Sequence, residues 1–581
     1  MQLRRVVLAA AAVSIALAGA FAPVRAQSTA KRAMDIEDVI AYRAMGAATL
    51  SNDGKWMAYR MSPTQGDSEV IVRSTTGDKE MKFAVGEGGF GATTFSEDSQ
   101  WIAIATSAKK SEADAARRAS RPAPQAGMTL VNLATGEKKD IAKIRRFAFN
   151  GEMGGWIALH RFGADAAAGG GAAAGAAGRA GGAPAAGGRG GGTAGDTRPK
   201  GTDLVLHDLK TGAEINIGNV SEFNFNKAGK TLALVIDAAD QAGNGVQLRD
   251  MTSGVVTPLE SDKAWYERMS WTDEGDALLV MKGHDETTAW KDRLYALVGW
   301  TGFDKGAPKK LTYDPMKDTS FPKEMGISTN RTPSFTESRD AILFGIAKIN
   351  KADPPAGRGR GAGAGAGAEG GDAPAAAGAN PDNADRPNLI LWNYKDPRLQ
   401  SAQQVQEAGD RAYTYLCTYR VADNKFVRLA DDDLRTVSPG PKDKFALGTD
   451  NRAYELQGNL DGRQFRDVYA VNMATGERKQ IRKQAQYSYQ ISPDGTKYYY
   501  YEAKHFFVVD LATGASKNIT QTIPTSFVDM EDDHNVVDPP VMPLGWTSDS
   551  KFVILNDDWD LWKVSADASA PAVNLTVTGK K

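Results

Sequence analysis

A turn followed by an apolar strand recurs nine times along this chain of 581 residues. In its clearest form the turn reads Ser-x-Asp-Gly, as in Ser51–Gly54 before the apolar stretch Trp56–Tyr59. Where no insertion intervenes, most copies follow one another at roughly 45 to 55 residues, a period typical of β-propeller blades. The turn phrases begin at Leu50, Phe95, Phe149, Phe225, Trp271, Phe335, Val437, Ile491 and Trp546, and those at Phe149 and Val437 are the weakest.

A second element accompanies most copies of the phrase. It is an alternating strand that ends in Thr-Gly and is followed by another short strand, as in Leu130–Glu137 and Phe507–Gly514. Glycine supplies the positive φ that tight hairpin turns require. Two hairpins per repeat make a four-stranded blade, so we expect an all-β propeller of about seven to eight four-stranded blades. The pattern leaves open whether the ring is complete at its C-terminal end.

Charge and cysteine content narrow the function classes. The chain has 70 basic and 71 acidic residues, so no global field would attract nucleic acid or an anionic membrane. Cys417 is the only cysteine, which excludes an internal disulfide and a thiolate metal cluster. Nucleic acid is therefore not an expected partner, and the oligomeric state cannot be read from the sequence.

The N-terminus has the pattern of an export signal. Arg4 and Arg5 precede the apolar run Val6–Phe21, and Val24–Ala26 resembles a cleavage site for a signal peptidase. We therefore expect residues 1–26 to be a cleaved signal peptide and residues 27–581 to be one propeller domain, periplasmic or secreted. No other apolar run approaches the ~20 residues that a membrane span needs. The paired arginines leave the choice between general and twin-arginine export open.

Two segments interrupt the repeat, residues 163–199 and 354–387. Both are dominated by glycine and alanine with scattered arginines. They lack the apolar content that offsets chain entropy, so they are predicted to be disordered loops extruded from the ring. Arginine–glycine tracts can also bind RNA, but arginines this sparse in an exported protein favour a plain surface loop.

A helical segment is expected after the second insertion. Leu399–Glu407 is rich in good helix formers and follows Asp396–Arg398, itself preceded by an apolar stretch predicted as a strand over 389–393. A second short helix is predicted over 36–44, before the first blade.

Motifs that carry catalytic chemistry are missing from the sequence. There is no Gly-x-Ser-x-Gly elbow, no His-Glu-x-x-His, no phosphate-binding loop and no dinucleotide fingerprint. Of the five histidines, His160, His207 and His505 fall in or beside predicted strands, which favours structural roles. The sequence therefore predicts no catalytic residue, no cofactor and no metal in this chain.

One polar cluster is dense enough to be a candidate site: Asp529, Glu531, Asp532, Asp533 and His534. Its oxygen-rich side chains could bind a hard cation such as calcium, although the spacing does not match an EF-hand loop. They could also form a substrate- or partner-facing surface, or a solvated acidic loop without a ligand. A glycan-hydrolysing propeller would need paired carboxylates in its channel, and neighbouring Asp532 and Asp533 would face opposite ways in a strand.

Several stretches resemble the prolyl oligopeptidase family of serine peptidases, the group that includes dipeptidyl peptidase IV. Ile36–Val39 before the first turn phrase resembles the entrance to that family's propeller. The resemblance is most specific in Leu391–Gln400, which contains Trp-Asn-Tyr-Lys-Asp-Pro, and in Gly545–Thr547 leading to Trp559–Val564. It implies an exported bacterial peptidase in which a propeller precedes a C-terminal hydrolase domain and admits peptides rather than folded proteins.

The resemblance does not extend to the family's catalytic residues. The Ser, Asp and His of the implied hydrolase domain have no counterpart in this sequence, so none is assigned. The leading hypothesis is a substrate-gating propeller of an exported serine peptidase, which meets peptide substrates when joined to its hydrolase domain. The alternative hypothesis is a stand-alone periplasmic propeller that binds proteins or peptides as a scaffold.

Overall fold

The computed structural model describes residues 33–87, 92–163, 200–286, 289–352 and 392–579. The expected signal peptide lies outside these residues, and so do both glycine- and alanine-rich segments apart from Gly163. The described part of the chain is almost entirely antiparallel sheet, and eight separate sheets follow one another in chain order. The predicted all-β propeller fold is confirmed.

The sheets divide into nine units of the same design. Seven sheets are one unit each, while the seven-stranded sheet β10–β16 contains two. Its central strand β13 pairs with β12 through its first half and with β14 through its second, and a bulge near Val220 separates the halves. The number of sheets agrees with the expected blade count, and the division of β13 raises the number of units to nine, one for each turn phrase.

Units one to four occupy the first half of the chain. Their strands are β1 (Arg43–Met45), β2 (Thr49–Leu50), β3 (Trp56–Pro63), β4 (Asp67–Ser74) and β5 (Glu80–Glu87); β6 (Thr93–Phe95), β7 (Trp101–Thr106), β8 (Gly127–Asn132) and β9 (Lys138–Ile141); β10 (Ile144–Phe149), β11 (Trp156–Arg161), β12 (Thr202–Asp208) and β13 (Glu214–Phe225); and β14 (Thr231–Ile236), β15 (Gly245–Asp250) and β16 (Val256–Ser261).

Units five to nine complete the series. Their strands are β17 (Trp265–Trp271), β18 (Ala277–His284), β19 (Leu294–Thr301) and β20 (Lys309–Tyr313); β21 (Met325–Ile327), β22 (Ser334–Phe335), β23 (Ala341–Lys348), β24 (Tyr415–Arg420) and β25 (Lys425–Arg428); β26 (Thr436–Pro439), β27 (Phe445–Asp450), β28 (Arg466–Asn472) and β29 (Arg478–Ala485); β30 (Tyr487–Ile491), β31 (Lys497–Glu502), β32 (His505–Asp510) and β33 (Ser516–Asn518); and β34 (Gly545–Trp546), β35 (Phe552–Asn556), β36 (Leu561–Ser565) and β37 (Val573–Asn574).

The turn phrase joins the first strand of each unit to the second and is fixed by a local hydrogen-bond pattern. In the first copy, the Ser51 hydroxyl donates to Asp53 Oδ1 at 2.7 Å and accepts from the Trp56 amide at 3.0 Å. Ser492 makes the same two contacts, with Asp494 and with the Lys497 amide. Because the hydroxyl both donates and accepts, serine or threonine at this place reinforces the backbone hydrogen bonds that close the turn, such as that from the Gly54 amide to the Ser51 carbonyl.

Turn phrases of neighbouring units also contact one another. The Asp53 amide donates to Ser99 Oγ at 3.1 Å, and the Asp494 amide donates to Ser550 Oγ at 2.9 Å. Between units three and four, the Met153 amide donates to the Ala228 carbonyl at 3.1 Å. In these pairs the recurring phrase therefore holds neighbouring units together. Its hydrogen bonds contribute to packing rather than to catalysis or ligand binding.

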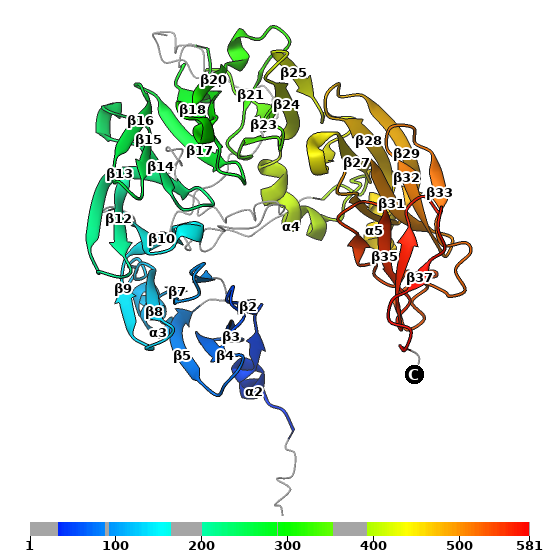
Figure 1. Ribbon diagram of the computed structural model, residues 1–581, viewed down its shortest axis with the longest axis horizontal. Helices are drawn as coiled ribbons and strands as arrows, with labels where there is room; N and C mark the ends of the chain where they lie inside the picture. Colours follow the sequence, from blue (N-terminus) through cyan, green and yellow to red (C-terminus); the bar gives the residue numbers. More distant parts are fainter. Residues whose placement is uncertain (1–32, 88–91, 164–199, 287–288, 353–391, 580–581) are drawn as a thin grey trace, which may run out of the picture.

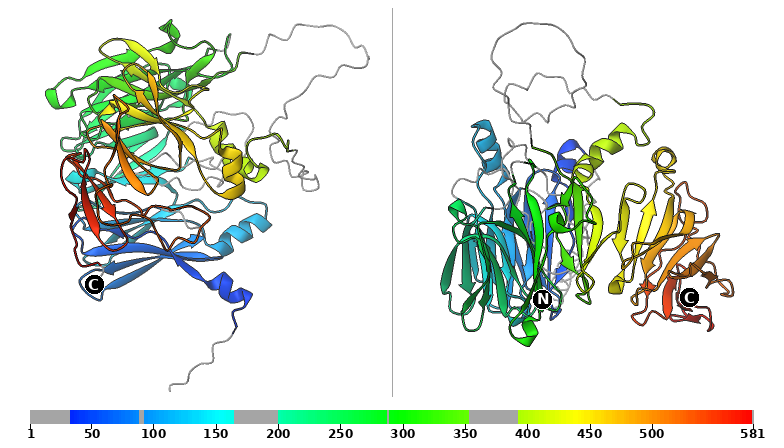
Figure 2. Two further views of the ribbon diagram at one scale, coloured as in Figure 1. Left: turned by 90° about the vertical axis from the view of Figure 1, so that its right-hand side faces the viewer. Right: turned by 90° about the horizontal axis from the view of Figure 1, so that it is seen from above.

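Because successive strands are antiparallel, the connections between strands lie on two opposite sides of the molecule, where the strands end. We call these two sides edges, in a sense unrelated to edge strands. The turn phrases and the Thr-Gly turns share one edge, which we call the turn edge. The connections between second and third strands, and those between units, share the other, which we call the loop edge. The helices α3 (Lys110–Arg118), α4 (Gln400–Arg411) and α5 (Glu455–Asp461) all belong to the loop edge and lie on the same side of the molecule in Figure 2.

Two helices were anticipated by the sequence and one strand was not found. The predicted helix over 399–407 is present as α4, and the helix predicted over 36–44 is α2 (Ile36–Ala41), which ends before β1. The strand predicted over 389–393 is wrong at Trp392 and Asn393, the part that is described. There the chain turns instead, since the Asp396 amide donates to the Asn393 carbonyl at 2.9 Å.

The nine units follow an arc, and its two ends, unit one in blue and unit nine in red, are separated in Figure 1. Burial along the second strands reflects this arrangement. In several internal units four consecutive residues of the second strand are buried, as in β7, β14 and β31, whereas β27 of unit seven has two alternate buried residues. In the end units only alternate residues are buried in β3 and β35, because one face of each end sheet lacks a neighbouring sheet.

No helix within the described ranges combines the length and the apolar character required to cross a bilayer.

Candidate functional site

The predicted acidic cluster lies in the connection between β33 and β34, on the loop edge. The base of this connection is closed by an isolated antiparallel bridge between Val528 and Pro540. The Asp529 amide donates to the Pro539 carbonyl at 2.7 Å, and the Val541 amide donates to the Phe527 carbonyl at 2.9 Å. Phe527 is almost completely buried in the core between units eight and nine. The sequence between these anchors therefore projects as a closed loop.

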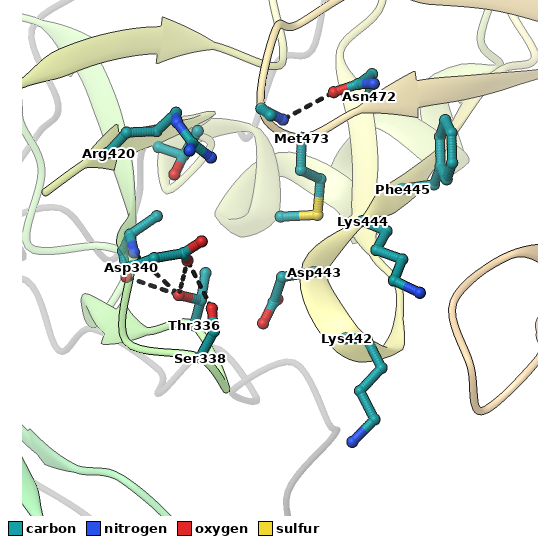
Figure 3. Close-up of a pocket in the computed structure, with 13 residues that line it drawn as sticks. Thr336, Ser338, Asp340, Arg420, Lys442, Asp443, Lys444, Phe445, Asn472 and Met473 are labelled. Carbon is teal, nitrogen blue, oxygen red and sulfur yellow. Dashed lines mark hydrogen bonds between the residues drawn. The ribbon is translucent and has the colours of Figure 1, made fainter. Parts of the chain in front are cut away.

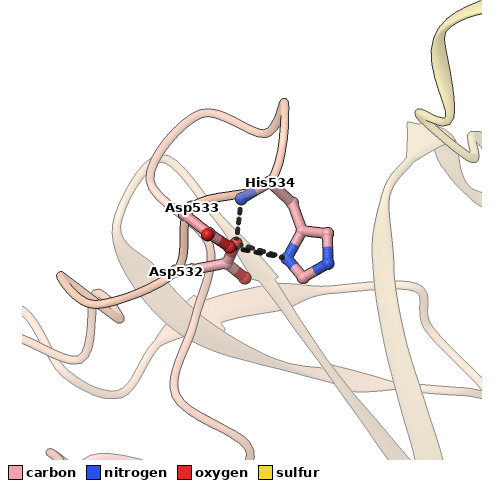
Figure 4. A group of neighbouring side chains, drawn as sticks. All are labelled: Asp532, Asp533 and His534. Atoms are coloured by element: carbon pink, nitrogen blue, oxygen red, sulfur yellow. Dashed lines mark hydrogen bonds and ion pairs between the residues drawn. The ribbon is translucent and has the colours of Figure 1, made fainter. Parts of the chain in front are cut away.

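The cluster's shape comes from two consecutive turns in which an aspartate caps the backbone. Asp529 Oδ1 accepts from the amides of Glu531 and Asp532 at 3.0 and 3.1 Å. Asp532 Oδ1 accepts from the His534 amide at 2.8 Å and lies 2.9 Å from His534 Nδ1 (Figure 4). The hydrogen bond to Asp532 and the charge of Asp532 raise the pKa of His534, and hydrogen bonds from the His534 amide and imidazole lower the pKa of Asp532. The imidazole is therefore more readily protonated than a free histidine.

The structure brings three predicted residues into one group. Ligand atoms of Asp532, Asp533 and His534 lie within 4.8 Å of one another. The expectation that neighbouring Asp532 and Asp533 would face opposite ways assumed a strand, and the segment is a loop. All three residues are exposed, the Asp533 side chain is 98% exposed, and the Asp532 side chain is 24% exposed. Water competes strongly for a cation at such a place, and one of the three donors, Asp532, is already bonded to His534.

Asp529 and Glu531 face a different neighbour, the short connection between β35 and β36. Burial and the charges of Asp529 and Glu531 raise the pKa of Asp558 in that connection. Met530 and Val537 of the same loop are 82% and 74% exposed, and Trp559, beside Asp558, is 56% exposed. The loop edge of unit nine therefore presents acidic and apolar side chains together, as a surface rather than as an enclosed site.

The remaining histidines of interest have structural partners. His160 is buried, its Nε2 lies 2.8 Å from the Val220 carbonyl, and Arg145 approaches its Nδ1 at 3.3 Å. Burial, reinforced by the positive charge of Arg145, lowers the pKa of His160 to about 4. His505 contacts Thr520, whose hydroxyl also accepts from the Phe506 amide. These contacts hold strands together.

Cys417 is also structural. Its side chain is fully buried in the core between units five and six, and burial raises the pKa of its thiol to about 12. A thiol of this kind is protonated at neutral pH and is inaccessible, so it packs as a small apolar residue.

The stretch that resembles the peptidase family, Trp392–Gln400, forms a compact structure on the loop edge. Arg398 is at its centre: its guanidinium pairs with Asp410 of α4 at 2.9 Å and with Glu455 of α5 at 3.7 Å. Gln403 Nε2 donates to the Arg398 carbonyl at 2.9 Å and to Asp396 Oδ2 at 3.2 Å. The motif thus joins the connection of unit six to that of unit seven.

Sequence reasoning missed a cavity of about 370 Å³ on the turn edge, between units six and seven. It forms where turn phrases meet, and the Glu337 amide donates to Asp443 Oδ2 at 2.8 Å across 106 residues of sequence. No sequence motif marks this contact. The aspartates of the phrase are explained by their turns alone, and the approach of two turns so far apart appears only in the folded chain.

Comparisons with known proteins concern the fold. No family model matches this chain, and no curated protein matches it either. A solved prolyl endopeptidase matches with 12% identity and a TM-score of 0.33, over 82% of this chain and 55% of that one. A eukaryotic initiation factor matches with 12% identity and a TM-score of 0.35, over 82% of this chain and 87% of that one.

The propeller domain of the Trilobed protease from Pyrococcus furiosus matches with 8% identity and a TM-score of 0.28, over 76% of this chain and 99% of that one. This chain spans about half the length of the prolyl endopeptidase.

Proposed function

We propose that this chain is the propeller part of an exported prolyl oligopeptidase-like serine peptidase, and that it controls which peptides reach a hydrolase domain. The observation that carries the proposal is the pair of family-like stretches, Trp392–Gln400 and Trp559–Val564, within one propeller. In this proposal the first stretch fixes the loop edge through Arg398, and the second forms part of unit nine.

The arrangement of the units is compatible with a filter. The turn phrases hold neighbouring sheets together along one edge, while helices and long connections gather on the other edge. In this proposal the arc of sheets, joined to the hydrolase domain, limits access by size, so extended peptides would pass where folded proteins would not. Chemistry is then left to a separate domain, which is why the acidic loop and the structural histidines need no catalytic role.

The proposal is tested by treating the purified chain with a fluorophosphonate probe and a chromogenic proline-containing peptide. We expect no covalent label and no turnover, because the proposal assigns the nucleophilic serine to another domain. A prolyl oligopeptidase of known activity in the same buffer controls the assay. Turnover that purifies with this chain and is abolished by the probe would overturn the proposal.

A stand-alone binding propeller is the second candidate, and the exposed acidic and apolar side chains at the loop edge of unit nine favour it. It too predicts no turnover, so the two candidates are separated by whether a hydrolase belongs to the same native polypeptide.

A further inference from the structure

The cavity between units six and seven is walled by two turn phrases and two strand ends (Figure 3). Its volume, about 370 Å³, is in the range of sites that hold small molecules. One wall comes from unit six, and the other from unit seven. The side chains used below are Thr336, Ser338, Asp340, Arg420, Lys442, Asp443 and Lys444.

Two carboxylates border the cavity, and each has one oxygen in use. Asp340 Oδ1 accepts from the hydroxyls of Thr336 and Ser338 at 3.0 and 2.6 Å. Asp443 Oδ2 accepts from the Glu337 amide at 2.8 Å. Within the described ranges, no hydrogen bond is made to Asp340 Oδ2 or to Asp443 Oδ1. Burial and the negative charges of Glu337 and Asp340 raise the pKa of Asp443, so a cation in the cavity would relieve an existing repulsion.

The lysines of the same wall are occupied elsewhere. Lys442 forms an ion pair with Glu337, which does not line the cavity, and Lys444 Nζ donates to the Asp494 carbonyl at 3.2 Å. Both side chains point away from Asp340 and Asp443 in Figure 3. The charge of Lys442 partly offsets the raised pKa of Asp443, but among the described residues neither lysine donates a hydrogen bond to Asp340 or Asp443.

Arg420 supplies a positive group on the wall opposite Asp443. Its Nε donates to Asp423 Oδ2 at 2.8 Å, and among the described residues nothing accepts a hydrogen bond from Nη1 or Nη2. A guanidinium with two free terminal nitrogens is suited to bind a carboxylate through two parallel hydrogen bonds. The cavity therefore offers acceptors for an ammonium group and donors for a carboxylate.

A metal ion fits these walls less well than an organic cation. In the part of the chain that the structure describes, the only group of three possible metal ligands within 4.8 Å of one another is the exposed Asp532–His534 group. Asp340 and Asp443 belong to no such group. Two separated carboxylate oxygens suit the several N–H donors of an ammonium group better than the close oxygen shell of a hard cation.

We propose that this cavity binds a small zwitterion of the amino-acid or dipeptide class, with its ammonium group at Asp340 and Asp443 and its carboxylate at Arg420. The proposal does not depend on the peptidase function, because the walls belong entirely to this chain.

Isothermal titration of the full chain with three probes at neutral pH tests this assignment. The probes are glycylglycine, N-acetylglycylglycine, which lacks the ammonium group, and glycylglycine amide, which lacks the carboxylate. We expect saturable binding of glycylglycine and affinity at least about tenfold lower for each blocked peptide, because each lacks one charge-assisted contact. Equal affinity for the three peptides, or no saturable binding of glycylglycine at millimolar concentration, would overturn the proposal.

Variants identify the site. Asp443→Asn should weaken glycylglycine binding at least about tenfold, since the amide keeps an acceptor for the Glu337 N–H but loses the charge. Asp549→Asn is the matched control: it makes the same change in the turn phrase of unit nine, away from the cavity, and it should leave the affinity within about twofold. Unchanged binding by Asp443→Asn would place the ligand elsewhere.

A second variant covers the case in which Asp443→Asn lowers the melting temperature. Arg420→Gln removes a side chain whose hydrogen-bond partner, Asp423, is partly exposed. The affinity for glycylglycine should fall at least about tenfold, and the affinity for glycylglycine amide should stay the same. Binding should also weaken as the pH falls, because Asp443, with its raised pKa, takes up a proton before an ordinary aspartate does. Affinity that stays constant as the pH falls through that range would contradict the role of Asp443.

Discussion

The requirement for glycine in a turn phrase depends on how closely the turn of the neighbouring unit approaches it. Gly229 has a φ of +73°, and a Cβ added there would lie 1.5 Å from the Asn150 carbonyl oxygen of the preceding turn. Gly54 occupies the same place in the first phrase, with a φ of +69°, and a Cβ there would meet nothing within 4 Å. Glycine at Gly54 is thus required by the backbone, whereas at Gly229 it is also required by the neighbouring unit.

These two glycines give a matched stability test. Gly54→Ala should lower the free energy of unfolding by about 1 to 2 kcal/mol, the cost of a left-handed alanine. Gly229→Ala should cost at least about 2 kcal/mol more, because the added methyl group forces two turns apart. Urea denaturation of both variants measures the difference. Equal losses would mean that the contact between units three and four contributes little.

His160 links a single buried residue to the pH dependence of stability. Its pKa in the folded chain is about 4, below the ordinary value of 6.5. Between pH 6.5 and pH 4 the unfolded chain therefore binds a proton that the folded chain does not, so stability falls as the pH falls, by up to about 3 kcal/mol from this group. His160→Gln should flatten the curve over that window. Parallel curves for the two proteins would contradict the burial of a neutral imidazole.

At the scale of strands, burial of neighbouring side chains in the second strand differs between unit five, inside the arc, and unit nine, at its end. In β18 of unit five, Leu278 and Leu279 face different cores and both are fully buried. In β35 of unit nine, Leu555 is fully buried while Ile554 beside it is only partly buried. The sequences of the two strands are equally apolar, so the difference comes from the missing neighbour on one side of unit nine.

This difference predicts unequal costs for equal truncations. Leu278→Ala, Leu279→Ala and Leu555→Ala should each destabilise by about 2 to 5 kcal/mol, as buried aliphatic residues do. Ile554→Ala should cost less than about 2 kcal/mol, because its side chain already contacts solvent. Chemical denaturation of the four variants checks this. A loss at Ile554 as large as that at Leu555 would mean that the outer face of unit nine is covered in solution.

Sequence reasoning succeeded for this fold where the information was local. Each turn phrase is a short local pattern of polar turn residues between an aromatic or aliphatic residue and an apolar strand, so the nine phrases located the nine first strands. It also located the acidic loop, whose shape follows from Asp529 and Asp532 capping the residues just after them. It could not find the open ends of the arc or the cavity at Asp443. Both depend on which units meet, and strands such as β35 have the same apolar composition whether or not a neighbour covers them.

For the molecule as a whole, the residues that build the fold are distinct from any residues that carry out chemistry. The repeat builds a stack of sheets held together by its turns, and His160, His505 and Cys417 serve packing and strand contacts. The function of this propeller is therefore decided by what it is joined to or what it binds.

The measurement that tests this most directly is made on the protein from its native source. A fluorophosphonate-labelled extract is separated by size, and the band that contains peptides of this sequence is examined for label and for intact mass. The account predicts a labelled polypeptide that exceeds the 62.1 kDa of this chain by the mass of a hydrolase domain. An unlabelled polypeptide no larger than 62.1 kDa would contradict the peptidase proposal and leave a binding propeller.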